Sequence, residues 1–117
     1  MSMAAWRRVL EEYEAELFKV PMPRIFRNEM GELERKTYAD GEELLEIVFR
    51  GAKVPDGSTV SVVIEGKHVC DIEVRRGRGR LDLSSLRGHE VPRVSHGDVA
   101  EIQFGGQALL RGTFKPD

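Results

Sequence analysis

The sequence predicts a mainly β fold, an antiparallel β-sandwich or partly closed barrel of about six to eight short strands with one N-terminal amphipathic α-helix. Two observations carry this prediction. Between Val54 and Phe114, apolar and polar residues alternate in short segments that glycines interrupt. Residues 3–19 instead carry apolar side chains at spacings of three and four, the period of a helix.

One domain is expected, because 117 residues with 40% hydrophobic and 32% charged side chains suit a single modest core under a solvated surface. We expect residues 1–20 to form the helix, residues 21–41 an arm or a hairpin, and residues 42–115 the β-sandwich core. The sequence shows no internal repeat and no interdomain linker.

The expected helix would end near Val20, since Pro21 and Pro23 oppose its continuation. Its second face is acidic, whereas a helix lying on a membrane surface would carry Lys and Arg there, so we exclude a membrane partner. The apolar stripe is expected to pack on the protein's own sheet or on a partner subunit. The predicted partner or oligomer contacts are Trp6, Val9, Leu10, Tyr13, Leu17 and Phe18.

Residues 24–38 leave three alternatives open: a hairpin around Asn28–Gly31, an irregular arm, or a second short helix. The Ala39-Asp40-Gly41 turn then leads into a predicted strand over residues 44–50. One face of that strand carries Leu45, Ile47 and Phe49.

A first hairpin is predicted after a type I turn at residues 54–57. Its strands, residues 58–65 and 68–76, bring their apolar faces together only in one register, which leaves residues 65–67 as a three-residue loop. The predicted opposite pairs are Val60 with Ile72, Val62 with Cys70, and Ile64 with His68.

Two further strand pairings are predicted in the same way, by placing the apolar side chains of both strands on one face of the sheet. Residues 79–84 are expected to pair with residues 68–76 and complete a three-stranded meander, with Gly77-Arg78 as a two-residue turn. The last hairpin is expected to have the loop 105–107 and to pair Ala100 with Gly112, Ile102 with Leu110, and Phe104 with Ala108. Residues 85–97 should cross between two sheets, with Val91 and Val94 reaching the core.

The run Arg75–Arg80 contains the most conspicuous charges. In the predicted register Arg75 and Arg80 lie opposite each other, with Glu73 and Asp82 as diagonal neighbours that would neutralise them. Arg76 and Arg78 have no evident carboxylate and are the candidate contacts for an anion or a nucleic acid. No aromatic residue lies nearby for base stacking, and the net charge of −2 provides no general attraction for phosphate.

Metal and catalytic chemistry are weakly represented. His89, Glu90, His96 and Asp98 lie at the two ends of one loop and form a possible loop site, but their spacing matches no familiar set of metal ligands. His68 and Cys70 share the face predicted to be core, so a half-buried histidine beside an apolar cysteine is the simpler interpretation. We therefore expect no cofactor, no metal and no enzymatic activity.

The predicted function is that of a non-enzymatic interaction or structural module that associates with itself, or with a protein partner, through the N-terminal helix. The alternative is nucleic-acid binding through the Arg75–Arg80 hairpin tip. Cys70 is the only cysteine, so no intramolecular disulfide can form. With no signal-like segment and no transmembrane run, a cytoplasmic location is expected.

Overall fold

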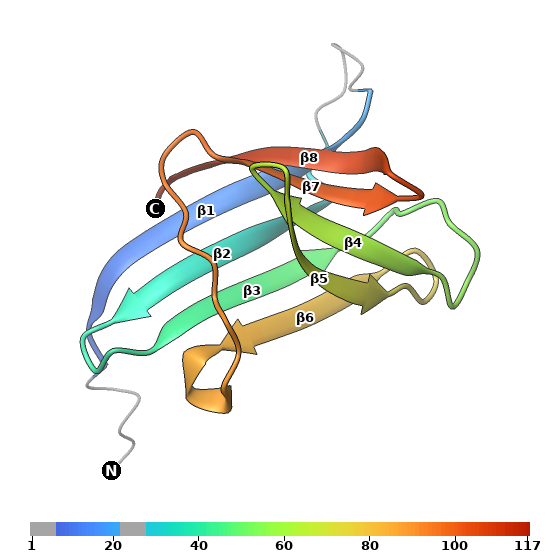
Figure 1. Cartoon of the computed structure of the whole chain (residues 1–117). Helices are drawn as coiled ribbons and strands as arrows, with labels where there is room; N and C mark the ends of the chain where they lie inside the picture. The colour runs from blue at the N-terminus through green and yellow to red at the C-terminus, as the bar shows by residue number, and fades with distance from the viewer. Residues whose placement is uncertain (1–6, 22–27) are drawn as a thin grey trace.

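The computed structural model describes residues 7–21 and 28–117, and within them eight antiparallel strands form one nearly closed, barrel-like sheet (Figure 1). The predicted mainly β, antiparallel fold is thereby confirmed. The strand order is β5-β4-β7-β8-β1-β2-β3-β6, which leaves β5 and β6 at the two edges. The strands are β1 (Val9–Lys19), β2 (Gly31–Tyr38), β3 (Glu43–Phe49), β4 (Thr59–Ile64), β5 (Lys67–Glu73), β6 (Gly79–Ser84), β7 (Val99–Phe104) and β8 (Gln107–Pro116).

The predicted N-terminal helix is wrong. Residues 9–19 form β1, which lies in the interior of the sheet between β8 and β2. The segment also has an alternation of period two, with Ala15 and Leu17 fully buried and glutamates between them. Because β2 and β8 each offer an open edge, pairing on both sides outweighs the helical spacing that included the exposed Val9 and Leu10.

Of the alternatives for residues 24–38, the second helix and the irregular arm do not form where the chain is described. Gly31–Tyr38 is the interior strand β2, and residues 22–27 lie outside the described part. A turn at residues 38–41, closed by the Gly41 N–H donating to the Tyr38 carbonyl at 2.9 Å, joins β2 to β3. The predicted face of Leu45, Ile47 and Phe49 is confirmed, because all three are buried.

The predicted hairpin registers are correct away from the turns and wrong next to them. Val60 pairs with Ile72 and Ile102 with Leu110, as expected. Near each turn a β-bulge shifts the register by one residue, so both loops have two residues in place of three. The two loop residues have positive φ in both hairpins, 49° and 75° at Glu65-Gly66 and 59° and 81° at Gly105-Gly106. With a two-residue turn alone, the apolar side chains of the two strands would face opposite sides of the sheet. The extra residue of the bulge returns them to the same side.

The predicted meander is also wrong, because β6 pairs with β3 and not with β5. Only the single bridge Arg75↔Arg78 joins the two edges of the sheet beside the hairpin turn, which is Arg76-Gly77, one residue earlier than predicted. Leu81 and Leu83 lie opposite Ile47 and Leu45. The apolar residues of β6 can therefore lie opposite those of β3 as well as those of β5. Pairing with β3 brings the sheet close to closure.

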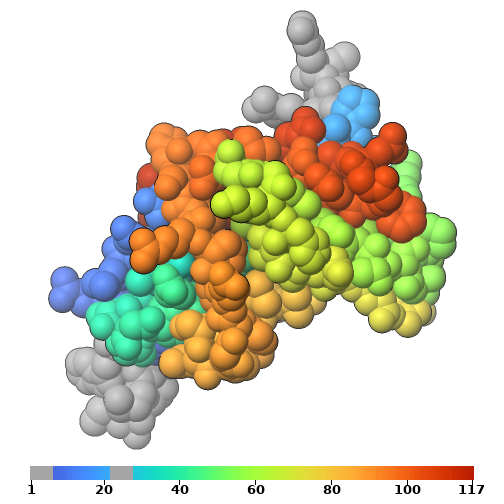
Figure 2. Space-filling view, in the orientation of Figure 1, coloured from blue at the N-terminus to red at the C-terminus, as the bar shows by residue number. Residues whose placement is uncertain are grey.

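Side chains from both halves of the sheet fill the interior, led by Phe49, Phe114, Leu17, Leu33, Leu45 and Ile47. Residues 88–98, which we call the strap, run from the short 3-10 turn Ser85–Arg87 after β6 to β7, across the front in Figures 1 and 2. Val91 is buried and Val94 packs on the core, which confirms the predicted core contacts, although the strap joins two strands of one sheet and does not cross between two sheets. No helix of the described residues is long and apolar enough to span a membrane.

Candidate functional site

A hollow of about 1020 Å³ opens where β2 begins, β3 ends and β6 begins. We call it the arginine groove, because four guanidinium groups from three chain segments line it. Three glutamates share its walls, so the groove carries both signs of charge. Its charged lining residues are Arg50, Arg75, Arg78, Arg80, Glu29, Glu32 and Glu73, and Met30, Gly31, Val48, Phe49 and Gly79 lie between them.

Two glycines shape the sheet at this groove. Gly31, Phe49 and Gly79 lie opposite one another on β2, β3 and β6. A Cβ atom on Gly79 would lie 2.4 Å from the Phe49 ring, and one on Gly31 would lie 2.2 Å from the Val48 carbonyl oxygen. The buried Phe49 therefore requires bare backbone on both sides, and the groove opens beside this row.

The arginines of the groove differ in how far carboxylates already neutralise them. Arg75 pairs with Glu73 and lies 3.9 Å from Asp56, while Arg80 lies 4.0 Å from Asp82. Glu73 and Asp82 were expected as diagonal neighbours across the hairpin, but each contacts the arginine two residues away on its own segment, because Arg75 faces Arg78 and not Arg80. The proximity of Asp56 to Arg75 was not predicted.

Arg76 and Arg78 form no ion pair with any residue of the described chain. The Asp56 carboxylate instead accepts the backbone N–H of Arg76 at 2.6 Å. Arg78 is one of the residues that line the groove, whereas Arg76 is at the hairpin turn beside it. The two arginines singled out in the sequence thus remain the cations with the most unused bonding capacity at this end of the barrel.

Carboxylates dominate the adjoining outer surface of β1, β2, β3 and β6. Glu14, Glu34, Glu46 and Asp82 lie directly opposite one another on these four successive strands. Lys36 contacts three carboxylates, at 3.9 Å from Glu12, 3.4 Å from Glu34 and 3.7 Å from Glu46. We call this surface the acidic face, and its members are Glu12, Glu14, Glu16, Glu32, Glu34, Glu46 and Asp82.

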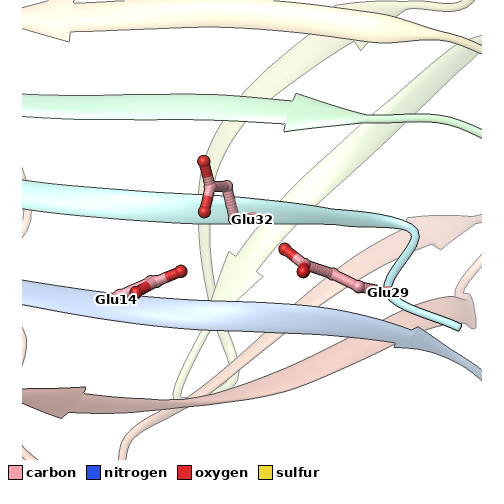
Figure 3. A group of neighbouring side chains, drawn as sticks. All are labelled: Glu14, Glu29 and Glu32. Carbon is pink, nitrogen blue, oxygen red and sulfur yellow. The ribbon is translucent and has the colours of Figure 1, made fainter. Parts of the chain in front are cut away.

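The densest negative charge lies where the acidic face meets the groove. Figure 3 shows Glu14 of β1, Glu32 of β2 and Glu29 just before β2 directing their carboxylates toward a common space, and one oxygen of each lies within 4.8 Å of the others. A hydrogen bond with Glu14, partial burial and the charge of Glu34 raise the pKa of Glu32 to about 7. Such oxygens suit a hard cation, but three surface glutamates alone do not define a metal site.

Glu32→Gln is expected to stabilise the protein at pH 8 by about 1 kcal/mol, the cost of opposing like charges on adjacent strands. With its raised pKa, folded Glu32 holds a proton between pH 4.5 and about 7 that the unfolded chain has lost. Stability from this group is present below pH 4.5 and falls as the pH rises through 7. The gain should therefore appear in urea unfolding at pH 8 and vanish near pH 5.

Glu11→Gln is the matched control on the adjacent strand, because Glu11 is exposed and lies opposite Thr37, so its neutralisation relieves no opposed like charge. Measurements should stay above pH 5. The Ser84 hydroxyl and Arg7 lower the pKa of Glu42, so its stabilisation is lost only as the pH falls below 4.5. Equal stability of Glu32→Gln and the wild type at pH 8 would contradict a strained carboxylate at this position.

The possible loop site of His89, Glu90, His96 and Asp98 is not brought together as one cluster. The His89 ring accepts the Ser84 N–H at 3.0 Å, and the His89 N–H donates to the Ser84 carbonyl at 3.1 Å, so His89 covers the end of β6. Asp98 accepts the Ser95 N–H at 2.8 Å and closes a turn. Glu90 and Asp98 share one hollow of about 540 Å³, whose lining does not include the two histidines of the strap.

His68 and Cys70 are separated by the bulge in β4–β5. His68 is exposed, contrary to the prediction of a half-buried histidine, and its Nε2 lies 2.8 Å from Asp71 Oδ1. Burial and then the charge of Asp71 raise the pKa of Cys70 to about 11. The thiol therefore stays protonated near neutral pH and is a poor nucleophile.

The predicted contact stripe of residues 6–18 is divided by the strand that replaces the helix. Leu17 is fully buried and Tyr13 packs on the core, while Val9 and Leu10 are exposed. Phe18 alternates with Leu17 and so lies on the opposite face of β1. Trp6 lies outside the described residues. The five members of the stripe that the structure describes form no common surface, and residues 9–19 are a strand, so association through an N-terminal helix is withdrawn.

Comparison with known proteins adds no assignment to this geometry. No family model, curated protein or solved structure matches the chain. The case for a function therefore comes from the arginine groove and the acidic face themselves.

Proposed function

We propose that this chain is a non-enzymatic protein-interaction module whose arginine groove holds an acidic segment of a protein partner. The observation that carries the proposal is Arg78, a groove-lining guanidinium without a carboxylate partner in the described chain. Arg50, Arg75 and Arg80 line the same hollow. Guanidinium groups bind carboxylates through two parallel hydrogen bonds, which makes such a cluster selective for acidic side chains.

The walls of the groove favour a protein partner over nucleic acid. Glu29, Glu32 and Glu73 lie among the arginines and would repel a continuous phosphate backbone. The one aromatic side chain of the lining, Phe49, is 2% exposed and offers no surface for a base to stack on. A protein segment can place isolated carboxylates against the arginines and leave the glutamates uncovered.

A non-enzymatic role also agrees with an arrangement among the described residues that resembles a catalytic triad. Ser84, Glu42 and His89 lie close together, as in a hydrolase triad. The Ser84 hydroxyl, however, donates to the Glu42 carboxylate, and the His89 ring accepts a backbone N–H and not the hydroxyl proton. Ser84 is also 3% exposed, so no substrate could reach it. This trio instead ties β6 to the turn before β3.

Arg78→Glu is expected to weaken binding of a Glu- and Asp-rich peptide about tenfold, the loss of one exposed charge-assisted contact. Fluorescence anisotropy of a labelled peptide, at nanomolar protein concentration and low salt, measures this. A single-stranded oligonucleotide of the same length is the second probe, and it should bind more weakly than the peptide.

Lys67→Glu is the matched control, since Lys67 is an exposed cation at the start of β5, remote from the groove lining. It changes the net charge by the same amount and should leave the affinity for the peptide unchanged. Tighter binding of the oligonucleotide, lost in Arg78→Glu, would favour the nucleic-acid alternative. Binding of neither probe would refute the groove as a ligand site.

A further inference from the structure

The arginine groove and the acidic face are neighbouring parts of one surface. Glu32, Val48 and Arg80 line the groove, and the same three residues line a smaller hollow together with Glu34, Glu46 and Asp82. Val48 thus lies at the boundary, with arginines on one side and opposed carboxylates on the other. We call the two halves together the dipolar face.

Each half of the dipolar face has an excess of the charge that the other half requires. The row of Glu14, Glu34 and Glu46 places like charges on adjacent strands, a destabilising arrangement that Lys36 offsets only in part. On the other side, Arg78 has no carboxylate partner in the described chain. No ion pair joins Arg78 to the acidic row within the described part of one protomer, so a second molecule would have to supply both contacts.

From this juxtaposition we propose that the carboxylates held by the groove belong to the acidic face of a second copy of this chain, in a two-fold symmetric dimer. The inference rests on the proposed function of the groove and names its partner. In a two-fold interface the same patch is used twice, so a surface with a positive and a negative half is complementary to itself after rotation. Arg78 and Arg80 of each protomer then lie on the Glu34–Glu46 row of the other.

Val48 supplies the apolar centre that such an interface needs. Its side chain is 41% exposed, although it lies in the middle strand of the β2-β3-β6 group. The other exposed large apolar residues of the described chain, Val9, Leu10, Leu86 and Phe104, line neither hollow. A rotation axis near Val48 brings the two valines into contact inside a charged rim, the usual arrangement of a protein interface.

The free edge of β6 favours face-to-face contact over continuation of the sheet into a second copy. Backbone groups of Arg78 are bonded to Arg75, and those of Ser84 are bonded to His89. The open part of the β6 edge is thereby confined to the few residues between these two closed ends. Val48 and the opposed charges line the two hollows of the outer face and do not follow this edge, so we place the contact on the outer face.

Exchanging the charges of the two halves tests the dimer. Arg78→Glu/Arg80→Glu puts two carboxylates at the contact in the arginine half, and Glu34→Arg/Glu46→Arg puts two guanidinium groups at the contact in the acidic row. Each variant alone should dissociate, with the dissociation constant raised at least tenfold. An equimolar mixture should restore a dimer with one copy of each, because both of its contacts then join opposite charges. Sedimentation equilibrium and native mass spectrometry measure mass and composition.

Two further measurements keep the test decisive if one charge variant does not fold. Val48→Glu places like charges on the axis and should also give monomers, whereas the control Lys67→Glu should dimerise like the wild type. The wild-type dimer should weaken as salt approaches 1 M, where the screening length is about 3 Å. Thermal unfolding of each variant separates lost association from lost folding.

The outcomes distinguish this inference from the proposed function. A monomeric wild type at low salt that still binds the acidic peptide would overturn the dimer and keep the groove as a binding site. A wild-type dimer that survives both charge exchanges and Val48→Glu would show that association uses another surface. Recovery of the dimer only in the mixture would establish the opposed halves as the contact.

Discussion

Gly112→Ala is expected to lower the free energy of unfolding by about 3 kcal/mol or more, since overpacking that moves backbone costs this much. A Cβ atom on Gly112 would lie 2.1 Å from the Glu16 carbonyl oxygen and 2.9 Å from its carbonyl carbon. The backbone of residue 112 fixes the position of its Cβ, and the Glu16 atoms that it meets are main chain. No side-chain rotation can therefore relieve the contact. β8 would have to move away from β1, in the interior of the sheet.

The matched control is Gly66→Ala in the β4–β5 turn. Gly66 has a φ of 75° but no atom within 4 Å of an added Cβ, so only backbone strain of about 1 kcal/mol is expected. Urea unfolding of the two variants measures the difference. Equal losses would mean that β8 does not approach residue 16 closely, as would be the case if residues 9–19 were a helix. The comparison therefore tests the strand that replaced the predicted helix.

Much of the fold can be predicted from the sequence, because its information is local. In β3 and β8, alternation fixes which side chains face inward, as the burial of Ile47 and Leu110 shows. Glycines mark the turns, and neighbouring strands of a hairpin have little choice of partner. The register of each hairpin therefore follows from which residues are apolar, except next to the turns. There the chain forms a bulge and a two-residue loop in place of the predicted three-residue loop.

The failures concern segments whose sequence fits two structures. Residues 9–19 satisfy both a helical stripe and an alternation of period two, and only the edges of β2 and β8, distant in sequence, decide between them. β6 can pair its leucines with either β3 or β5, and closing the barrel selects β3. Such choices depend on contacts between distant parts of the chain, which propensities do not contain.

In the candidate site, too, some residues can be recognised from the local sequence and others only from the pairing of distant strands. Arg76 and Arg78 could be recognised as unneutralised cations from the turn and the spacing of nearby carboxylates. The acidic face could not, because its rows exist only once four strands are in register. Its signal was nonetheless present: Glu12, Glu14 and Glu16 alternate, as do Glu32 and Glu34. Interpreting the first set as the solvated side of a helix concealed that they would align with the second.

The second large effect is expected at Arg35, a charged residue that faces the interior of the barrel and is 4% exposed. Its Nε–H donates to the Pro92 carbonyl at 3.1 Å, its Nη2 to Glu43 at 2.8 Å, and its Nη1 to the Thr37 hydroxyl. Arg35→Met keeps the apolar stem but removes every donor. The Pro92 carbonyl and Glu43 then lose their partner, which should cost about 2–3 kcal/mol.

Because Pro92 lies on the strap, Arg35→Met should destabilise the strap more than it destabilises the rest of the barrel. Hydrogen exchange should accelerate in Arg35→Met at the His89 and Gly97 amides, which donate to the Ser84 and Phe114 carbonyls, by more than the change in global stability explains. Arg93→Met is the control on the same segment: Arg93 is exposed, so its replacement should stay within about 0.5 kcal/mol of the wild type. If Arg35→Met proved as stable as the wild type, the strap would be held by Val91 packing alone.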